Sequence, residues 1–564
     1  MNHHLSLRKK VIIMVSVMAS LFLVALDQTI IATALGKIVQ DFNAFSSLSW
    51  VVTAYLITTT ITVPIAGKLS DLFGRRKILL IGVALFAIGS LMSGASGDIV
   101  QLVLWRAFQG IGGGIITANA FTIVGDLFAA RERGKWQGMI GAVFGLASVA
   151  GPLLGGFLTE GHQVLGLVTT DWRWTFWINV PIAIVAFILI AIYCPALKHE
   201  GKQRIDYLGA GLLTVFLGTL ILAIDNTEQI FAGLLGDGGL TLSGLRVIMF
   251  SIVALSLAAL IIVEKRATQP IIQLAFFKNK NFVLIMTLAL LNGAAFLGSI
   301  LYLTQFNQQV FGASPTQSGL MLLPLVAGLM ISSIGAGQLV SRTGKYKMLI
   351  VSGFMVMTVM TILLTTLTPS TTYLYEAIIM FVLGLGTGIG LPVLNIAVQN
   401  EFSQKDLGVV TSSNQLFRSL GSTIGVAIFG SLLTIGIATS LGDMKNDPYI
   451  QTLRQSPAAS QIITETDNPD VLLRLNTSAT KSMITDGFNT AVVNIPQPAR
   501  DDAKATLTKN QDAYSTKIVN AFSNSIHTIF IVASVFVAIA AALSIAIKEK
   551  PLERAKPLDT PGEV

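Results

Sequence analysis

Fourteen separate apolar runs constrain what this chain can fold into more than any other feature. A helical span needs about 20 apolar residues. Runs of this length fall near 11–35, 49–69, 78–97, 100–124, 136–158, 174–194, 207–225, 246–264, 282–310, 317–340, 347–367, 373–398, 409–438 and 522–546. Charged residues make up 12% of the sequence, against about 25% in a soluble domain. The chain is therefore predicted to be an all-α polytopic membrane protein with 14 transmembrane spans.

One short pattern occurs twice between these runs. Gly67–Lys77 (GKLSDLFGRRK) and Gly337–Lys347 (GQLVSRTGKYK) each have a second Gly seven places after the first, followed by Lys or Arg. The two copies lie 270 residues apart (337 minus 67), which matches six spans plus two. We therefore expect two six-helix bundles, related as inverted or pseudo-symmetric repeats, with two inserted helices. Many secondary transporters are built from such repeats.

This repeat divides the chain into six parts. We expect an N-terminal six-span bundle at 1–200, two inserted spans with linkers at 201–280, the first five spans of the C-terminal bundle at 281–439, an extracellular loop or cap at 440–521, the last span at 522–546 and a cytoplasmic tail at 547–564.

The positions of the basic residues predict the orientation. With the N-terminus inside, 25 of the 38 Lys and Arg residues fall on inner segments, and most of the outer ones lie in the long loop 440–521. Long loops cross a membrane largely regardless of their charge. Both termini are therefore predicted to be cytoplasmic. The net charge of +8 reflects this topology, so we expect no nucleic-acid partner.

Two opposite charges lie inside predicted spans. Asp27 and Arg106 each cost at least about 2.5–3.5 kcal/mol to insert. At 1.5 Å per residue they lie roughly 12 Å and roughly 9 Å below the outer ends of their spans, so they can meet. They are candidate proton-coupling residues, and the alternative is an ion pair that only fixes helix packing. Arg418, in the inner half of its span, is expected to extend to the inner interface.

The first copy of the repeated pattern carries a candidate inner gate. Gly67 and Gly74 allow close helix approach and tight turning. Asp71 can pair across to the other half, and Arg75 and Arg76 can pair with Asp126 at the inner end of span four, closing the inner mouth. The alternative is a charge cluster that only sets topology. That alternative explains the arginines but leaves Asp71 and the repeated glycines unexplained.

Span five is rich in small residues. It reads GAVFGLASVAGPLLGG, with Gly151, Gly155 and Gly156 around Pro152. Small residues at three- and four-residue spacing let a neighbouring helix pack closely, and a proline kinks the span.

Several of these motifs together resemble the major facilitator superfamily. GKLSDLFGRRK is similar to its inner-loop signature, LVLWRAFQGIGGG (Leu102–Gly114) to its fourth-span motif, and the span-five segment to the signature of its proton-driven exporters. LDQTIIATAL (Leu26–Leu35) and WRWTFWINVP (Trp172–Pro181) resemble the fourteen-span drug:proton antiporter branch. The second inner-loop copy departs from the pattern, because Ser341 replaces its aspartate.

The resemblance implies proton-coupled export of small amphipathic or cationic drugs across the plasma membrane of a prokaryote. It implies coupling roles for Asp27 and Arg106, an inner gate at Asp71, Arg75 and Arg76, and an antiporter hallmark at Gly151–Pro152. The proton gradient is the expected driving force. No cofactor or metal is expected, and the expected partners are protons, the drug and the lipid bilayer. The protein is expected to be a monomer.

Other residues are assigned from polarity alone. Amides within spans could orient substrates in an apolar cavity, and these are Gln109, Asn292, Gln305 and Asn395, although a helix–helix hydrogen bond is an alternative role for each. The last six spans offer one further carboxylate, Glu376, near their outer edge, whose part in coupling stays open.

Two other functions remain as alternatives. A dedicated exporter of one metabolite, lipid or antibiotic would share the scaffold, and a receptor or scaffold would use 440–521 to bind a partner. A membrane enzyme is not expected, because no nucleophile–base pair is evident and all five histidines lie at span ends or in loops.

Overall fold

The structure, a computed structural model, describes residues 6–42, 48–159, 161, 163–164, 168–195, 205–224, 227–231, 235, 241–441, 444, 446–454, 469–476, 478–493 and 496–552. Fourteen helices within these ranges are long and apolar enough to cross a membrane. The predicted all-α architecture and span count are therefore confirmed.

The first six spans form one bundle. Its sixth span is broken into two helices, and a two-stranded antiparallel ribbon that pairs Gln163 with Thr169 precedes it. The elements are α1 (Leu7–Asp41), α2 (Leu48–Phe73), α3 (Arg75–Gly94), α4 (Ile99–Leu127), α5 (Arg133–Thr159), β1 (Gln163–Val164), β2 (Val168–Thr169), α6 (Trp174–Trp177) and α7 (Asn179–Tyr193). Tyr55, Phe86 and Phe121 are buried in its core.

The two inserted spans are α8 (Tyr207–Ile224) and α10 (Leu242–Arg266), with the short helix α9 (Thr227–Ile230) between them. Leu213 and Leu217 of α8 share an apolar cluster with Ile61 of α2 and Leu416, which belongs to the second bundle. The inserted pair therefore packs at the junction of the two bundles.

The second bundle contains the remaining six spans. Its second span is also broken, where Leu322 precedes Pro324, and α12 and α13 share it. The elements are η3 (Leu274–Lys278), α11 (Lys280–Gln309), α12 (Pro315–Met321), α13 (Leu323–Thr343), α14 (Lys347–Leu364), α15 (Tyr373–Gln399), η4 (Gln404–Asp406), α16 (Leu407–Leu441) and α20 (Gln497–Ile545).

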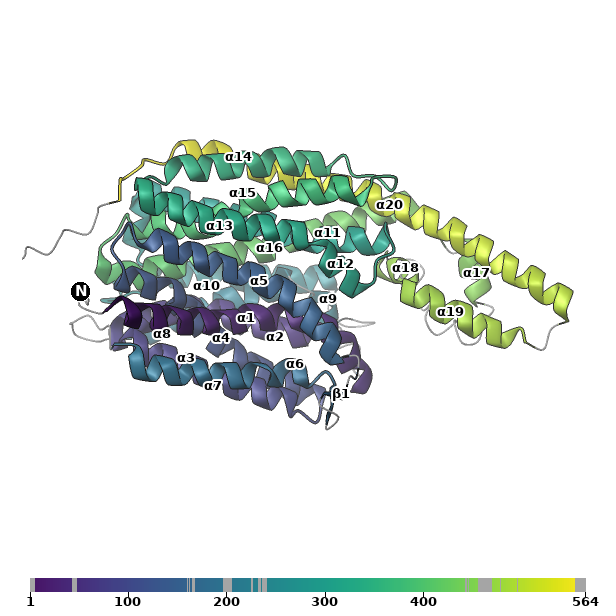
Figure 1. Ribbon diagram of the computed structural model, residues 1–564, viewed down its shortest axis with the longest axis horizontal. Coiled ribbons are helices and arrows are strands. Elements are labelled where there is room, and N and C mark those ends of the chain that lie inside the picture. The colour runs from purple at the N-terminus through teal and green to yellow at the C-terminus, as the bar shows by residue number, and fades with distance from the viewer. Residues whose placement is uncertain are drawn as a thin grey trace, which may run out of the picture.

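Both bundles start on the same side of the molecule. The N-terminal end of α1 and the C-terminal end of α20 lie on the same side of the molecule, at the left in Figure 1. Asn281 at the start of α11 donates to the carbonyl of Lys548 at 2.8 Å, which places that start on the same side. Of the two relations expected, the pseudo-symmetric one therefore applies: the halves are parallel repeats about an axis along the membrane normal. We call this side the terminal side.

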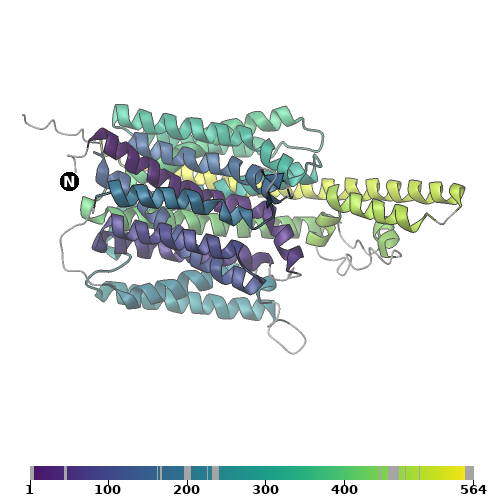
Figure 2. The same ribbon diagram turned by 60° about the horizontal axis from the view of Figure 1, so that its bottom comes forward.

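The described part of 440–521 is helical and projects from the opposite side, which we call the hairpin side (Figures 1 and 2). α20 has 49 residues, so it is about 74 Å long and extends far beyond a bilayer core of about 30 Å. Its outer part forms hydrogen bonds with α17 (Pro448–Arg454), α18 (Pro469–Leu475) and α19 (Ser478–Ala491). Tyr514 is buried there and donates to the carbonyl of Leu472 at 2.9 Å.

On the terminal side, the residues after α20 cross the loops of the second bundle. Glu549 accepts from the backbone N–H groups of Tyr346 and Lys347 at 2.8 and 3.0 Å, at the start of α14. Lys550 forms an ion pair with Glu401 at 2.6 Å. Of the predicted tail 547–564, residues 553–564 lie outside the described residues.

Candidate functional site

The Asp27 carboxylate lies inside the first bundle, fully buried, and three side chains donate to it. Arg106 of α4 donates from Nη1 to Oδ2 at 2.6 Å. Gln109 donates to Oδ1 at 2.9 Å, and Asn179 at the start of α7 donates to the same oxygen at 3.3 Å. The structure therefore brings Asp27 and Arg106 together as expected. It adds Asn179, which the Trp172–Pro181 motif contained but polarity alone did not single out.

Aromatic rings enclose the other side of Arg106. Its guanidinium lies 4.3 Å from the ring centre of Tyr55 and 5.6 Å from that of Phe176. Its Nε also donates to the carbonyl of Val51 at 3.3 Å. The pair therefore connects α1, α2, α4, α6 and α7, so a change in the charge of Asp27 would act on the packing of the whole bundle.

The predicted inner gate is assembled around Arg75. This arginine is buried, forms an ion pair with Asp71, and donates from Nε to Asp126 at 2.8 Å. Arg76 does not join Asp126 as expected; it donates to the carbonyl of Ala191 in α7. The reason is helix geometry, because α3 begins at Arg75 and consecutive side chains point about 100° apart.

The gate also contacts the second bundle. The Asp71 carboxylate lies against Gly408, in the first turn of α16, where an added Cβ would overlap it. The positive end of that helix favours a carboxylate. Gly67 likewise lies against Ser412, and an added Cβ would overlap the Ser412 hydroxyl. Helices α2 and α16 of opposite halves are thus in close contact on the terminal side.

A second crossing between the halves joins α5 and α13. A Cβ at Gly134 or at Gly337 would overlap the carbonyl oxygen of the other glycine. Gln137 of α5 donates to Gln399 of α15 at 3.2 Å, and Gln399 donates to the carbonyl of Phe121 at 3.2 Å. The two halves are therefore closed together on the terminal side.

The span-five motif connects α5 to two other helices. A Cβ at Gly151 would overlap Thr29 of α1, two residues from Asp27. Pro152 lies against Gly319 of α12, where an added Cβ would be 3.1 Å from the proline ring. Gly155 and Gly156 are buried on the same helix. The motif thus packs α5 onto the helix that carries the buried carboxylate.

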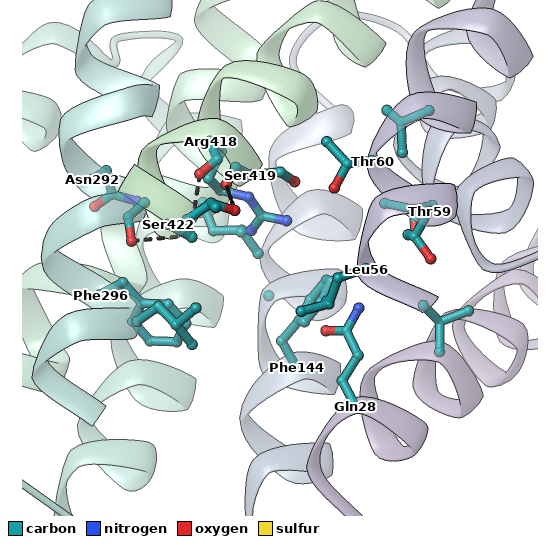
Figure 3. A pocket seen from close by; sticks show the side chains of 18 of the residues that line it. Gln28, Leu56, Thr59, Thr60, Phe144, Asn292, Phe296, Arg418, Ser419 and Ser422 are labelled. Atoms are coloured by element: carbon teal, nitrogen blue, oxygen red, sulfur yellow. Dashed lines mark hydrogen bonds between the residues drawn. The ribbon is translucent and has the colours of Figure 1, made fainter. Parts of the chain in front are cut away.

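A cavity of about 210 Å³ lies between the two halves. Figure 3 shows side chains from both halves around it, with Arg418 reaching from α16 into the space between α11 and α2. Besides the Arg418 guanidinium, its polar lining consists of hydroxyls and amides. Its apolar lining includes aromatic rings of both halves. The lining residues are Val24, Gln28, Leu56, Thr59, Thr60, Val63, Thr117, Gly141, Phe144, Ile221, Asn292, Gly293, Phe296, Leu297, Leu329, Thr387, Gly388, Leu391, Arg418, Ser419, Ser422 and Thr423.

Of the four amides expected to orient substrates, the structure places one, Asn292, on the cavity wall. Gln109 is engaged with Asp27, and Gln305 is not among the lining residues. Asn395 accepts from Asn414 at 2.8 Å and from Gln415 at 3.2 Å, away from the lining. Gln109 and Asn395 instead make helix–helix hydrogen bonds.

The expectation for Arg418 was wrong. Its side chain lines the cavity and does not extend to the inner interface. Its guanidinium lies 5.3 Å from the ring centre of Phe144, across the junction of the halves. The close approach of α11 at Gly293, where a Cβ would overlap the carbonyl of Arg418, fixes this position.

Glu376 is buried at the outer end of α15, outside the cavity lining. With its amide oriented to satisfy both groups, Asn307 of α11 donates to the two carboxylate oxygens at 2.9 and 3.0 Å. This pairing joins the ninth and twelfth spans, and it could not be read from the sequence, because nothing in the sequence fixes which helices of the bundle are neighbours.

Comparison with known proteins gives consistent results. The profile of the Major Facilitator Superfamily matches residues 17–426. The chain is 34% identical over 560 residues to the multidrug transporter protein MdtP of Bacillus subtilis, covering 98% of this chain and 95% of that protein. It is also 34% identical over 492 residues to multidrug resistance protein 3 of the same organism, covering 86% and 92%. The solved structure of the proton:xylose symporter XylE shares the fold, with a TM-score of 0.57 at 15% identity over 96% of this chain and 97% of that one.

Proposed function

Because this chain belongs to the major facilitator superfamily, we propose that it exports small amphipathic compounds from the cell in exchange for protons. The observation that carries this proposal is the Asp27 carboxylate, buried with Arg106 inside a span and next to the cavity. An ionisable group inside a membrane is costly and marks a proton or substrate pathway. The names of the two Bacillus subtilis relatives support multidrug export.

The proton site and the cavity lie on adjacent faces of α1. Val24 and Gln28 line the cavity, whereas Asp27 between them faces Arg106. A proton and a substrate therefore do not compete for the same atoms. Coupling would pass through the position of α1: protonation of Asp27 removes its ion pair with Arg106, and the released helix opens the cavity to the other side.

Alternating access would use the terminal-side contacts as the inner gate. The Asp71 carboxylate, paired with Arg75, would move away from α16, and α5 would move away from α13, when the cavity opens inward. A substrate drives this exchange only through a different affinity for the two states. We place the terminal side in the cytoplasm, because Lys and Arg residues concentrate there. The hairpin of α17–α20 is then extracellular, and the transporter works as a monomer with the proton gradient and no cofactor.

The test is dye transport into everted membrane vesicles energised by respiration, with proton movement followed by a pH-sensitive dye. Asp27→Asn keeps the shape of the side chain but fixes its charge in the neutral form. Wild type is expected to accumulate amphipathic dyes and to lose this activity with an uncoupler. Asp27→Asn is expected to lose dye-linked proton movement by at least about tenfold while still binding dye.

The matched control is Asp502→Asn, an exposed aspartate of the hairpin. It should leave both readouts unchanged. Dye-linked proton movement that persists undiminished in Asp27→Asn would remove this carboxylate from the mechanism.

A further inference from the structure

The central cavity carries a positive charge and no negative one. Of the described residues that line it, Arg418 is the one with an ionisable side chain. No described carboxylate forms an ion pair with it. Figure 3 shows its guanidinium in the open space between the halves, with no hydrogen bond drawn to it.

An arginine inside a membrane bundle is costly unless something balances its charge. The Phe144 ring, 5.3 Å away, provides a cation–π contact, which offsets part of this cost. Arg106 shows what full compensation is in this protein, because it has a carboxylate at 2.6 Å, an amide and two aromatic rings. Arg418 lacks the carboxylate, and its surroundings leave room for one from a bound molecule.

The groups around Arg418 suit an anionic headgroup. A guanidinium presents a planar fork of donors that matches carboxylate, sulfonate or phosphate oxygens. Ser419 and Asn292 lie beside it on α16 and α11, whereas the Ser422 hydroxyl already donates to the carbonyls of Gly293 and Arg418 (Figure 3). The lining also includes apolar side chains, among them Leu56, Phe296 and further aliphatic residues, which would contact a hydrophobic body.

A cationic substrate has no matching partner there. It would meet Arg418 in a desolvated space, where like charges repel strongly. The buried carboxylate of Asp27 in the first bundle already holds three donors and is not among the lining residues of the cavity. The cavity therefore does not support the cationic substrates that the family resemblance led us to expect.

We propose that this cavity selects amphipathic compounds that carry a negative charge, with Arg418 as the residue that binds the anionic group. This inference rests on the proposed export function, since it concerns the substrate of the same cavity.

The test compares three dansyl-labelled alkyl chains of one length that end in a sulfonate, a hydroxyl or a trimethylammonium group. Uptake into energised everted vesicles is measured with and without an uncoupler. Wild type is expected to export the sulfonate at least about tenfold faster than the trimethylammonium probe. Arg418→Gln should reduce sulfonate export at least about tenfold and change hydroxyl export by less than about twofold. Arg418→Lys should retain most of the sulfonate export.

Arg246→Gln is the matched control, because Arg246 is an exposed arginine of the inserted helix α10. It should leave all three rates unchanged. Uncoupler-sensitive export of the hydroxyl probe, together with equal handling of the sulfonate and trimethylammonium probes, would overturn the charge preference but not the export function.

Failure of all three probes to move would overturn the export proposal itself. The charge preference is then judged by dansyl fluorescence on binding to the purified full-length protein. Sulfonate binding that is no tighter than trimethylammonium binding, or that survives in Arg418→Gln, would overturn it as well.

Discussion

The three donors to Asp27 determine the free-energy cost of protonating its carboxylate. Breaking a buried ion pair by neutralising one partner typically costs about 3–5 kcal/mol. Gln109 and Asn179 can still donate to a protonated carboxyl, but Arg106 would be left with its rings, the Val51 carbonyl and the Gln109 oxygen. A proton therefore binds readily only when a change of helix packing gives Arg106 another partner. This requirement would link protonation to conformation.

A second buried carboxylate, outside the membrane, gives a pH-dependent prediction. Burial opposes ionisation of Glu401, but hydrogen bonds from Lys550, Asn281 and Asn279 outweigh it and lower the pKa of this carboxyl. Its contribution to stability is therefore full above the ordinary glutamate pKa of about 4.3 and is lost as the pH falls through the lowered pKa. Glu401→Gln should lower the thermal unfolding midpoint at about pH 7 and flatten its fall toward about pH 3.

The measurement is tryptophan fluorescence of the purified protein during heating at a series of pH values. Glu549 lies next to Lys550 in the segment after α20 and accepts from two backbone groups, so Glu549→Gln is a useful comparison. An unfolding midpoint with the same acid dependence in Glu401→Gln as in wild type would contradict the role of this ion pair.

Depth in the membrane, counted in residues from the span ends, was enough to predict the pairing of Asp27 with Arg106. It was not enough to predict where the Arg418 side chain lies. Asp27 and Arg106 are opposite charges at a similar level, and their contact follows from counting residues. Arg418 could not be placed this way, because the rotation of α16 about its axis decides whether a side chain faces lipid, a loop or the cavity. That rotation depends on contacts with α11 and α2, which single-sequence patterns do not contain.

At the level of helices, the crossing of α5 and α13 sets how closely the halves can approach. Gly337→Ala would place a Cβ onto the carbonyl oxygen of Gly134. Overpacking of this kind typically costs about 1–3 kcal/mol. We expect a lower unfolding midpoint and at least about tenfold slower export, because the inner gate could no longer close fully.

Gly335 offers a matched control two residues away on the same helix. An added Cβ there meets nothing within 4 Å. Gly335→Ala should therefore leave export unchanged and raise helix stability slightly, since alanine favours a helix over glycine by about 1 kcal/mol. Equal effects of the two substitutions on export would show that the crossing does not limit the closed state.

Helix ends were less predictable than helix centres. Hydropathy located all fourteen spans but placed the last one at 522–546, whereas α20 begins at Gln497. The polar first half of α20 lacks an apolar run, and its contacts are with α17, α18 and α19, through Tyr449, the carbonyl of Leu472 and Lys481. The loop 440–521 therefore had no sequence signal that separated a folded hairpin from an irregular cap.

At the scale of the whole molecule, the closed terminal side and the positive charge of the cavity bear on the net charge that would cross the membrane in one transport cycle. The halves meet at α2–α16 and at α5–α13, so the cavity is separated from the terminal side. In the proposed cycle, protons move inward and the substrate moves outward. If the substrate is an anion bound at Arg418, its exit adds one positive charge to the net inward movement, whatever the number of protons.

This difference predicts how export depends on the membrane potential. One elementary charge gains about 2.3 kcal/mol per 100 mV, which is about 50-fold in a steady-state accumulation ratio. The sulfonate probe moves one charge more per cycle than the hydroxyl probe. Collapsing the potential with valinomycin and potassium, with the pH gradient kept, should therefore reduce sulfonate accumulation in everted vesicles much more than hydroxyl accumulation. A fall by the same factor for both probes would mean that the sulfonate does not cross as a free anion. A cation would then cross together with the sulfonate, and the role proposed for Arg418 would be wrong.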